Sequence, residues 1–295
     1  MVADQNSRIL ITGATGFTGR LLRRRLEGRG LSVFCLHQFS KSGRIDLRDS
    51  AAVRDAVFQC SPTHVVHLGG ITSNTHPNVP EIYDVNVVGT AHLYTALAEL
   101  PIVPLQIIHA SSVTVYAPPV APGLLTEDSL LRPIDHYGSS KLAGEEIARH
   151  FGRRLPILIV RPFNCTGPGQ DSKLVIAKIV HHFRVKAPEI RMGDINIARD
   201  FSNIGDAVEI YDRLLNSGTS GTVVNISSGR ATTLSSVVNH LKALSGHDIT
   251  IIQDPQFMRA GEPRAIFGST ARLESLIGPM QRVPLEQTLK DMLES

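Results

Sequence analysis

The chain has 295 residues, of which 42% are hydrophobic and 19% are charged, enough apolar material for the core of one large domain or of a domain with a smaller appendage. The formal net charge of +3 is too small to single out nucleic acid or a membrane surface as a partner, so any anion site must be local. No apolar run approaches the ~20 residues of a membrane span, and we expect a cytoplasmic protein with neither a membrane nor a nucleic-acid partner.

The first predicted strand leads directly into a glycine-rich turn. Residues 8–12 form a short β-branched and apolar run, which is followed by Gly13-Ala-Thr-Gly16-Phe17-Thr-Gly19 and then by leucines at helical spacing. Glycines at this spacing let a strand turn sharply into a helix and let the backbone approach a pyrophosphate, which the helix N-terminus attracts. We therefore expect a dinucleotide site with cofactor contacts from Gly13, Gly16, Phe17 and Gly19.

Further apolar runs alternate with helix-length segments, at residues 31–36, 65–68, 105–109, 157–160 and 223–226. This alternation predicts a parallel sheet with helices on both faces, the α/β architecture of a Rossmann-type doubly wound fold. From Pro162 onward proline and glycine become denser, so we expect a smaller, discontinuous C-terminal substrate lobe. The predicted boundaries are 1–165 plus about 201–226 for the dinucleotide-binding domain, and about 166–200 plus 227–295 for the substrate lobe.

The cysteines and histidines do not form a recognisable disulfide or metal pattern. Cys35, Cys60 and Cys165 are odd in number and far apart, and no two of them form a Cys-x-x-Cys pair. The adjacent His181 and His182 point in different directions, which does not suit a shared set of metal ligands. We expect free, mostly buried thiols, structural or solvent-facing histidines, and no metal.

A tyrosine and a lysine stand four residues apart at the start of a helix-patterned stretch, in the sequence Tyr137-Gly-Ser-Ser-Lys141. This spacing places both side chains on one helical face, about a turn apart. A phenol with a pKa near ~10 is a poor acid or base at neutral pH, and a neighbouring ammonium lowers that pKa by stabilising the phenolate. The pair alone is equally compatible with two surface residues, so its meaning depends on the motifs around it.

Together with the glycine turn and Ser111-Ser112-Val-Thr-Val-Tyr116, this pair resembles the extended short-chain dehydrogenase/reductase family, which includes the NAD-dependent epimerases and dehydratases. The resemblance spans nearly the whole chain. The other matching motifs are Asp46-Leu47, His67-Leu68-Gly69-Gly70, Asn86-Val-Val-Gly89-Thr90, Arg161-Pro162-Phe163-Asn164, Gly167-Pro168-Gly169 and Arg199-Asp200-Phe201. Three places depart from the family pattern. Gly69-Gly70 replaces Ala-Ala and predicts extra room near the cofactor, Ala117-Pro118 stands where glycine is usual, and residues 276–279 lack the common Leu-Gly-Trp.

The resemblance implies roles for individual residues. Ser112, Tyr137 and Lys141 would form the catalytic group, with Ser112 holding the substrate oxygen and Lys141 also binding the nicotinamide ribose. Cofactor contacts beyond the glycine turn would come from His37, Asp46, Leu47, Leu68, Gly69, Gly70, Asn86, Tyr137, Lys141 and Pro162. Substrate contacts would come from Ser112, Thr114, Asn164, Arg199 and Arg259. Asn164, Arg199 and Arg259 would hold the nucleotide diphosphate, because guanidinium groups suit phosphate oxygens. For Arg259 the alternative is an ordinary charged residue on the protein surface, which is nearly as compatible with the sequence.

The residues after Ser112 bear on the type of reaction. The 4,6-dehydratases of the family carry an Asp-Glu pair there, whereas this chain has Val113 and Thr114, which argues against elimination of water. A 4-keto reductase, a 4-epimerase or a dehydrogenase remains, and each needs hydride exchange at a carbonyl and one proton from tyrosine. The motifs from Arg161 to Phe201 are most similar to reductases of GDP-linked 4-keto-6-deoxy-mannose. A catalytically silent NAD(P)-binding protein is the alternative of another class, and the intact catalytic group argues against it.

The end of the second predicted strand indicates which nicotinamide cofactor is used. NAD-preferring members place a carboxylate there, about 18 residues after the last glycine, where it binds the ribose hydroxyls. This chain has His37 at that place and no carboxylate between Leu31 and Arg44, while Ser40, Lys41 and Arg44 are close enough in sequence to meet a phosphate. We therefore expect NADP, with use of both NADP and NAD as the alternative.

The resemblance also implies a homodimer. Family members pair through two helices across a two-fold axis, and these correspond to the helix of Val85, Val88, Leu93 and Leu97 and to the helix of Tyr137. The apolar positions of the first helix could equally cover the sheet, so the sequence leaves this interface open.

Overall fold

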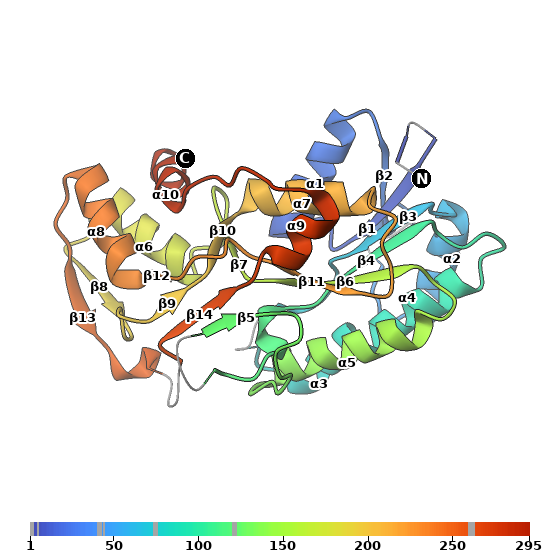
Figure 1. Ribbon diagram of the computed structural model, residues 1–295, viewed down its shortest axis with the longest axis horizontal. Coiled ribbons are helices and arrows are strands. Elements are labelled where there is room, and N and C mark those ends of the chain that lie inside the picture. The colour runs from blue at the N-terminus through green and yellow to red at the C-terminus, as the bar shows by residue number, and fades with distance from the viewer. Residues whose placement is uncertain are drawn as a thin grey trace.

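The fold is built on a six-stranded sheet in which every pair of neighbouring strands is parallel (Figure 1). The computed structural model describes residues 3–4, 6–39, 43, 45–72, 76–119, 123–258 and 263–295. In sheet order the strands are β11 (Val223–Ile226), β6 (Ile157–Pro162), β4 (Gln106–Ala110), β3 (His64–His67), β1 (Arg8–Thr12) and β2 (Ser32–Cys35). Ile9 and Ile11 of β1 belong to one hydrophobic cluster and Leu10 to another, so both faces of the sheet are buried.

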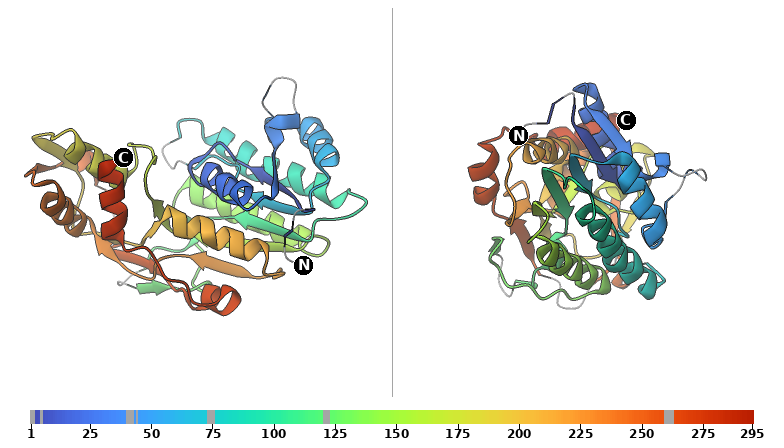
Figure 2. Two further views of the ribbon diagram at one scale, coloured as in Figure 1. Left: turned by 90° about the horizontal axis from the view of Figure 1, so that it is seen from above. Right: turned by 90° about the vertical axis from the view of Figure 1, so that its right-hand side faces the viewer.

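Helices cover both faces of this sheet, as the end-on view in Figure 2 shows. One face carries α1 (Phe17–Gly28), α7 (Ile204–Leu215) and α9 (Ala271–Ile277), and the other carries α2 (Ser50–Cys60), α4 (Gly89–Ala98) and α5 (His136–Phe151). Short turns of 3-10 helix lie at Leu36–Phe39 and Val113–Val115, and α3 (Val79–Tyr83) runs through a π-helical turn, Asp84–Val88, into α4. The predicted strands and the doubly wound parallel sheet are confirmed.

The apolar side chains of α4 show which way this helix faces. Leu93 and Leu97 are fully buried in the cluster that α4 forms with the sheet, whereas Val88, just before the helix, is 43% exposed. Leu93 and Leu97 are therefore not available to a subunit interface, because the sheet already covers them, and the predicted homodimer through this helix stays a prediction. Their alternative role, covering the sheet, is the one found.

The remaining elements form smaller sheets beside the large one, at the left of Figure 1. β12 (Thr232–Thr233), β9 (Ala198–Arg199), β14 (Ala265–Gly268) and β5 (Gly123–Leu125) form one, while β8 (Glu189–Met192) with β13 (Thr250–Gln253) and β7 (Asn164–Thr166) with β10 (Phe201–Asn203) form two pairs. A separate hydrophobic cluster joins α6 (Val175–Arg184), α8 (Leu234–Ser245) and α10 (Leu285–Glu294). The residue boundaries predicted for the two domains stay a prediction.

The order of the strands fixes where a ligand can bind. β2 pairs with one edge of β1, and the chain then returns to place β3 along the other edge. The carboxyl ends of β1 and β3 therefore flank a crevice of the kind in which open α/β sheets bind ligands. Within the part of the chain that the structure describes, every helix falls short of the length and hydrophobicity that a membrane crossing requires.

Candidate active site

The glycine turn lies at this crevice and joins β1 to α1. Gly13 has φ +68°, a left-handed conformation that costs glycine nothing, and a Cβ there would lie 2.8 Å from the backbone nitrogen of Gly69. A Cβ on Gly19 would lie 2.2 Å from the carbonyl oxygen of Gly13. Gly16 is the N-cap of α1, and no described side chain caps the helix, which leaves its first N–H groups available to an anion.

A cavity of about 590 Å³ opens between this turn and the end of β2. Its lining includes four of the predicted cofactor contacts, namely Gly13, His37, Asp46 and Leu47. The Arg48 guanidinium hydrogen-bonds both carboxylate oxygens of Asp46 and holds the pKa of that carboxyl below its usual value. A glycine-rich turn beside a cavity of this volume and lining fits the adenosine half of a dinucleotide. The predicted phosphate contacts Ser40, Lys41 and Arg44 lie outside the described residues.

The carboxyl end of β3 forms the other wall of the crevice. The backbone N–H of Gly69 donates to Thr12 Oγ1 at 2.9 Å, and a Cβ on Gly69 would lie at the same 2.9 Å from that oxygen. A Cβ on Gly70 would lie 2.8 Å from Asn86 Oδ1. The extra room expected from these two glycines is therefore absent, because the side chains of Thr12 and Asn86 fill it. Leu68, just after β3, is half-buried and packs against the hydrophobic cluster that contains Ile9 and Ile11 of β1.

Asn86 lies in the π-helical turn and uses its amide within the protein. Its Oδ1 accepts from the Ile71 N–H at 2.7 Å, and its Nδ2 donates to the Ile71 carbonyl at 3.0 Å and to Ser140 Oγ at 2.9 Å. Ser140 Oγ in turn donates to the carbonyl of Tyr137 at 2.7 Å. The amide of Asn86 thus ties the segment after β3 to the helix of Tyr137, and its predicted contact with the cofactor stays a prediction.

Ser112 and Tyr137 meet where β4 ends and α5 begins, and Lys141 lies one helical turn beyond Tyr137 on α5. Ser112 follows β4 and caps the short turn 113–115 by accepting from the Thr114 N–H at 3.2 Å, and its side chain acts on the pKa of Tyr137. Asp135 caps α5 by accepting from the Gly138 N–H at 2.7 Å. A Cβ on Gly138 would lie 2.5 Å from the Thr114 carbonyl oxygen, so only glycine lets α5 approach the Ser112 turn this closely.

Burial dominates the electrostatics of this group. Burial raises the pKa of Tyr137, the hydrogen bond from Ser112 acts against it, and the Asp135 carboxylate adds to it. The lowering expected from the Tyr137/Lys141 pair is thus reversed, and Tyr137 stays protonated at neutral pH. Burial also lowers the pKa of Lys141 to about 8, with Glu145 acting against that change. The site therefore holds a phenol that can donate a proton beside a lysine that titrates near physiological pH.

Among the predicted substrate contacts, Asn164 and Arg199 lie on the short strands β7 and β9, while Ser112 and Thr114 lie at the turn after β4. Asn164 begins β7 and donates its amide to the Asp200 carbonyl at 3.0 Å, while Arg199 donates to the carbonyls of Ala198 and Pro263 at 2.8 and 3.0 Å. Thr114 donates its hydroxyl to Ser112 Oγ at 2.9 Å. Arg259 lies outside the described residues.

Pro162, a predicted cofactor contact, ends β6 in register with Ile226 of β11. It is half-buried there. Its contact with the cofactor, like the other contacts assigned by resemblance, stays a prediction.

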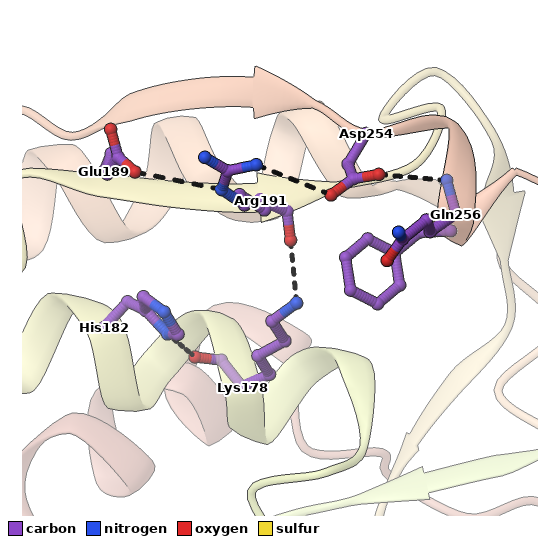
Figure 3. A pocket seen from close by; sticks show the side chains of 7 residues that line it. Lys178, His182, Glu189, Arg191, Asp254 and Gln256 are labelled. Carbon is purple, nitrogen blue, oxygen red and sulfur yellow. Dashed lines mark hydrogen bonds and ion pairs between the residues drawn. The ribbon is translucent and has the colours of Figure 1, made fainter.

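A second cavity, of about 510 Å³, lies between α6, β8 and the segment that follows β13 (Figure 3). Lys178 donates to the Arg191 carbonyl at 2.7 Å, and its ammonium lies 4.2 Å from the centre of the Phe257 ring. Asp254 lines the same cavity and caps the 3-10 turn Pro255–Phe257 by accepting from the Gln256 N–H at 2.9 Å. These residues combine a cation, an aromatic ring and a carboxylate. Sequence analysis missed them because the contact joins positions far apart in the chain.

The comparisons with known proteins agree with this arrangement. The model of the NAD dependent epimerase/dehydratase family matches residues 9–227. The GDP-6-deoxy-D-mannose reductase of Pseudomonas aeruginosa is 30% identical over 97% of this chain and 96% of its own. The GDP-6-deoxy-D-talose 4-dehydrogenase of Aggregatibacter actinomycetemcomitans is 28% identical over 92% and 91%. The structure of RMD from P. aeruginosa complexed with NADPH superimposes with a TM-score of 0.88, at 28% identity, over 99% of this chain and 98% of that one.

Proposed function

Because the chain belongs to the NAD dependent epimerase/dehydratase family, we propose that it reduces the 4-keto group of a nucleotide-linked 4-keto-6-deoxy sugar, with a GDP-sugar as the favoured substrate. The chain is an NAD(P)-dependent oxidoreductase. The observation that carries the proposal is the buried, protonated Tyr137, whose pKa responds to the Ser112 side chain, with the buried Lys141 one helical turn away on α5. This is a group built to hold a carbonyl oxygen and to give it a proton.

The reaction follows from the position of each side chain. A reduced nicotinamide cofactor, held by the glycine turn and the adenosine cavity, would supply the hydride chemistry for the carbonyl carbon C4. Ser112 binds the carbonyl oxygen and stabilises the negative charge that develops on it. Tyr137 donates its phenolic proton to that oxygen, so the product is an alcohol. Lys141, one helical turn away, supplies a positive charge that favours the phenolate left behind, and this limits the cost of the transfer.

The residues next to Ser112 support reduction over dehydration. The side chain of Val113 packs against the apolar cluster around Val115, and the Thr114 hydroxyl donates to Ser112 Oγ. Neither can act as the additional acid or base that loss of water from C5 and C6 requires. Epimerisation or dehydrogenation at C4 uses the same three side chains, and the relatives include a 4-dehydrogenase, so product analysis must separate these reactions.

The nucleotide part of the substrate is proposed to extend over β7 and β9 toward the cavity of Lys178, Asp254 and Phe257. An ammonium suits a phosphate or a base carbonyl, an aromatic face suits a planar base, and a carboxylate can accept the two N–H groups on one edge of guanine. This chemistry supports a purine nucleotide and agrees with the GDP-sugars named for the two relatives.

The finer features of the proposal concern the cofactor, the assembly and the location. We propose NADPH as the preferred cofactor, supported by His37 in the adenosine cavity and by the engagement of Asp46 with Arg48. NADPH is also bound in the related RMD structure. We further propose a cytoplasmic homodimer, for which sedimentation at micromolar concentration is the test, and a stable monomer would contradict it.

The proposed activity is tested by incubating the protein with GDP-4-keto-6-deoxy-mannose and NADPH while following the absorbance of the reduced cofactor. Stoichiometric oxidation of NADPH with formation of a GDP-6-deoxyhexose is expected, and Tyr137→Phe serves as the control. Interconversion of 4-epimers without net consumption of NADPH would identify an epimerase instead. If the protein binds NADPH but turns over no 4-keto sugar nucleotide, the proposed reductase activity is wrong and the catalytically silent NAD(P)-binding protein is the remaining hypothesis.

A further inference from the structure

A buried ion pair joins α5, the helix of Tyr137 and Lys141, to strand β6. Glu145 of α5 and Arg161 of β6 have side chains that are 0% and 1% exposed, and Arg161 donates to both carboxylate oxygens of Glu145, at 2.8 and 2.7 Å. Arg161 also donates to the Tyr116 hydroxyl and to the Glu127 carbonyl, each at 3.0 Å. A charge pair this deeply buried is weak evidence for a gain in stability, since desolvation offsets its attraction. Its position therefore invites a functional explanation.

The Glu145 carboxylate touches both segments that carry catalytic side chains. It lies one helical turn beyond Lys141 on α5. It also accepts a hydrogen bond of 2.6 Å from the hydroxyl of Ser111, the residue before Ser112. Arg149, on the same helix, donates to Glu145 at 2.7 Å from the protein surface. One carboxylate thus joins the end of β4 to the helix of Tyr137 and Lys141.

The other groups around Lys141 do not balance its charge. His67 and His109, on the neighbouring strands, are buried, and burial holds the pKa of His67 at about 3 and that of His109 well below its usual value, so both are neutral. Tyr137 is protonated, and Arg149 and Arg161 are cations. Among the described groups that act on the pKa of Lys141, Glu145 is the one that raises it, against the effect of burial.

We propose that Glu145 is a positioning residue of the active site, whose buried carboxylate keeps Lys141 charged and fixes Ser112 opposite Tyr137 through Ser111. The effect on catalysis rests on the proposed function. The effect on Lys141 does not, because Lys141 is expected to bind the cofactor, and cofactor binding can be measured without a substrate. A purely structural ion pair would change stability but would not move a pH profile.

The test compares Glu145→Gln with Glu146→Gln, the control one residue along the same helix. The Glu146 side chain is 66% exposed and pairs with Arg149 through Nη1, so its replacement leaves the bond from Arg149 Nη2 to Glu145 in place. The pH dependence of NADPH affinity, from cofactor fluorescence, and of kcat/KM is measured for both. Glu145→Gln removes a negative charge near Lys141, so the fall of both quantities at high pH is expected to begin about one pH unit lower. Glu146→Gln is expected to match the wild type. Superimposable profiles for Glu145→Gln and the wild type would overturn the proposal.

Arg149→Met provides a test of opposite sign that does not depend on removing a buried group. Its side chain is 37% exposed and is a cation bound to Glu145, so its loss is expected to move the fall at high pH upward. If Glu145→Gln fails to fold, an unchanged or lowered profile for Arg149→Met overturns the proposal. Ser111→Ala keeps the charge of Glu145 and is expected to lower kcat several-fold without shifting the profile. If the wild type reduces no 4-keto sugar, the cofactor titrations still decide the role of Glu145.

Discussion

Replacing Gly138 with alanine should separate the hydroxyls of Ser112 and Tyr137 without removing either of them. A Cβ at this position would lie 2.5 Å from the backbone carbonyl oxygen of Thr114 and 2.9 Å from Pro133 Cβ. Ordinary contact begins at 3.4 Å, so α5 and the Ser112 turn must part by about 0.9 Å in a closely packed interior. A misplacement of ~1 Å at a reacting centre costs on the order of 10²-fold in rate. Overpacking of this kind costs about 1–3 kcal/mol of stability.

The assay is kcat for NADPH-dependent reduction, together with the NADPH dissociation constant and the melting temperature. Gly138→Ala is expected to lose roughly 10²-fold in kcat and to melt several degrees lower, while the adenosine cavity is expected to change little because no residue of α5 lines it. Gly28→Ala is the control, since a Cβ there has no atom within 4 Å. Activity of Gly138→Ala within threefold of the wild type would show that the approach of α5 does not set the Ser112–Tyr137 geometry.

Three further predictions concern the chemistry of the site. Tyr137→Phe should abolish turnover and leave NADPH binding nearly intact, and Ser112→Ala should cost on the order of 10²-fold; more than a few per cent of activity in the tyrosine variant contradicts the assignment. The ratio of kcat/KM with NADPH to that with NADH should exceed one, and a ratio at or below one removes the argument from His37. Because the pKa of Lys141 is about 8, the lysine is charged below that pH, and kcat/KM for reduction should fall as the pH rises through it; a flat profile across that range would mean that the charge is not needed.

The sequence predicted those parts of the site that are encoded locally. The run from Arg8 to Gly19 specifies strand, turn and helix within twelve residues, and Tyr137 and Lys141 share a helical face by their spacing alone. Both patterns depend on residues that are close together in the chain, so the sequence alone was enough to predict them. The alternation of strands and helices likewise predicted the parallel sheet.

Other features depend on what the rest of the chain brings near. The direction of the pKa change at Tyr137 follows from its burial, which no spacing of tyrosine and lysine reveals. The space beside Gly70 is occupied by the side chain of Asn86, sixteen positions later in the chain. The sequence pattern could not show whether Leu97 packs on the sheet or on a partner subunit, whereas the structure shows that it is buried against the sheet. Lys178 and Phe257 meet only through the packing of α6 against the end of β13.

The short strand β5 has a consequence for the order in which the protein can mature during synthesis. It lies in the segment between Ser112 and Tyr137, yet its partner is β14, with Gly123 opposite Ile266 and Leu125 opposite Gly268. A ribosome must therefore produce roughly 140 further residues after β5 before this pairing can form, and closure of so long a loop is slow compared with local helix and turn formation. We expect a nascent chain released before β14 to build much of the large sheet but to leave the segment between Ser112 and Tyr137 without its strand partner. Activity should thus appear only after the last strand has been translated.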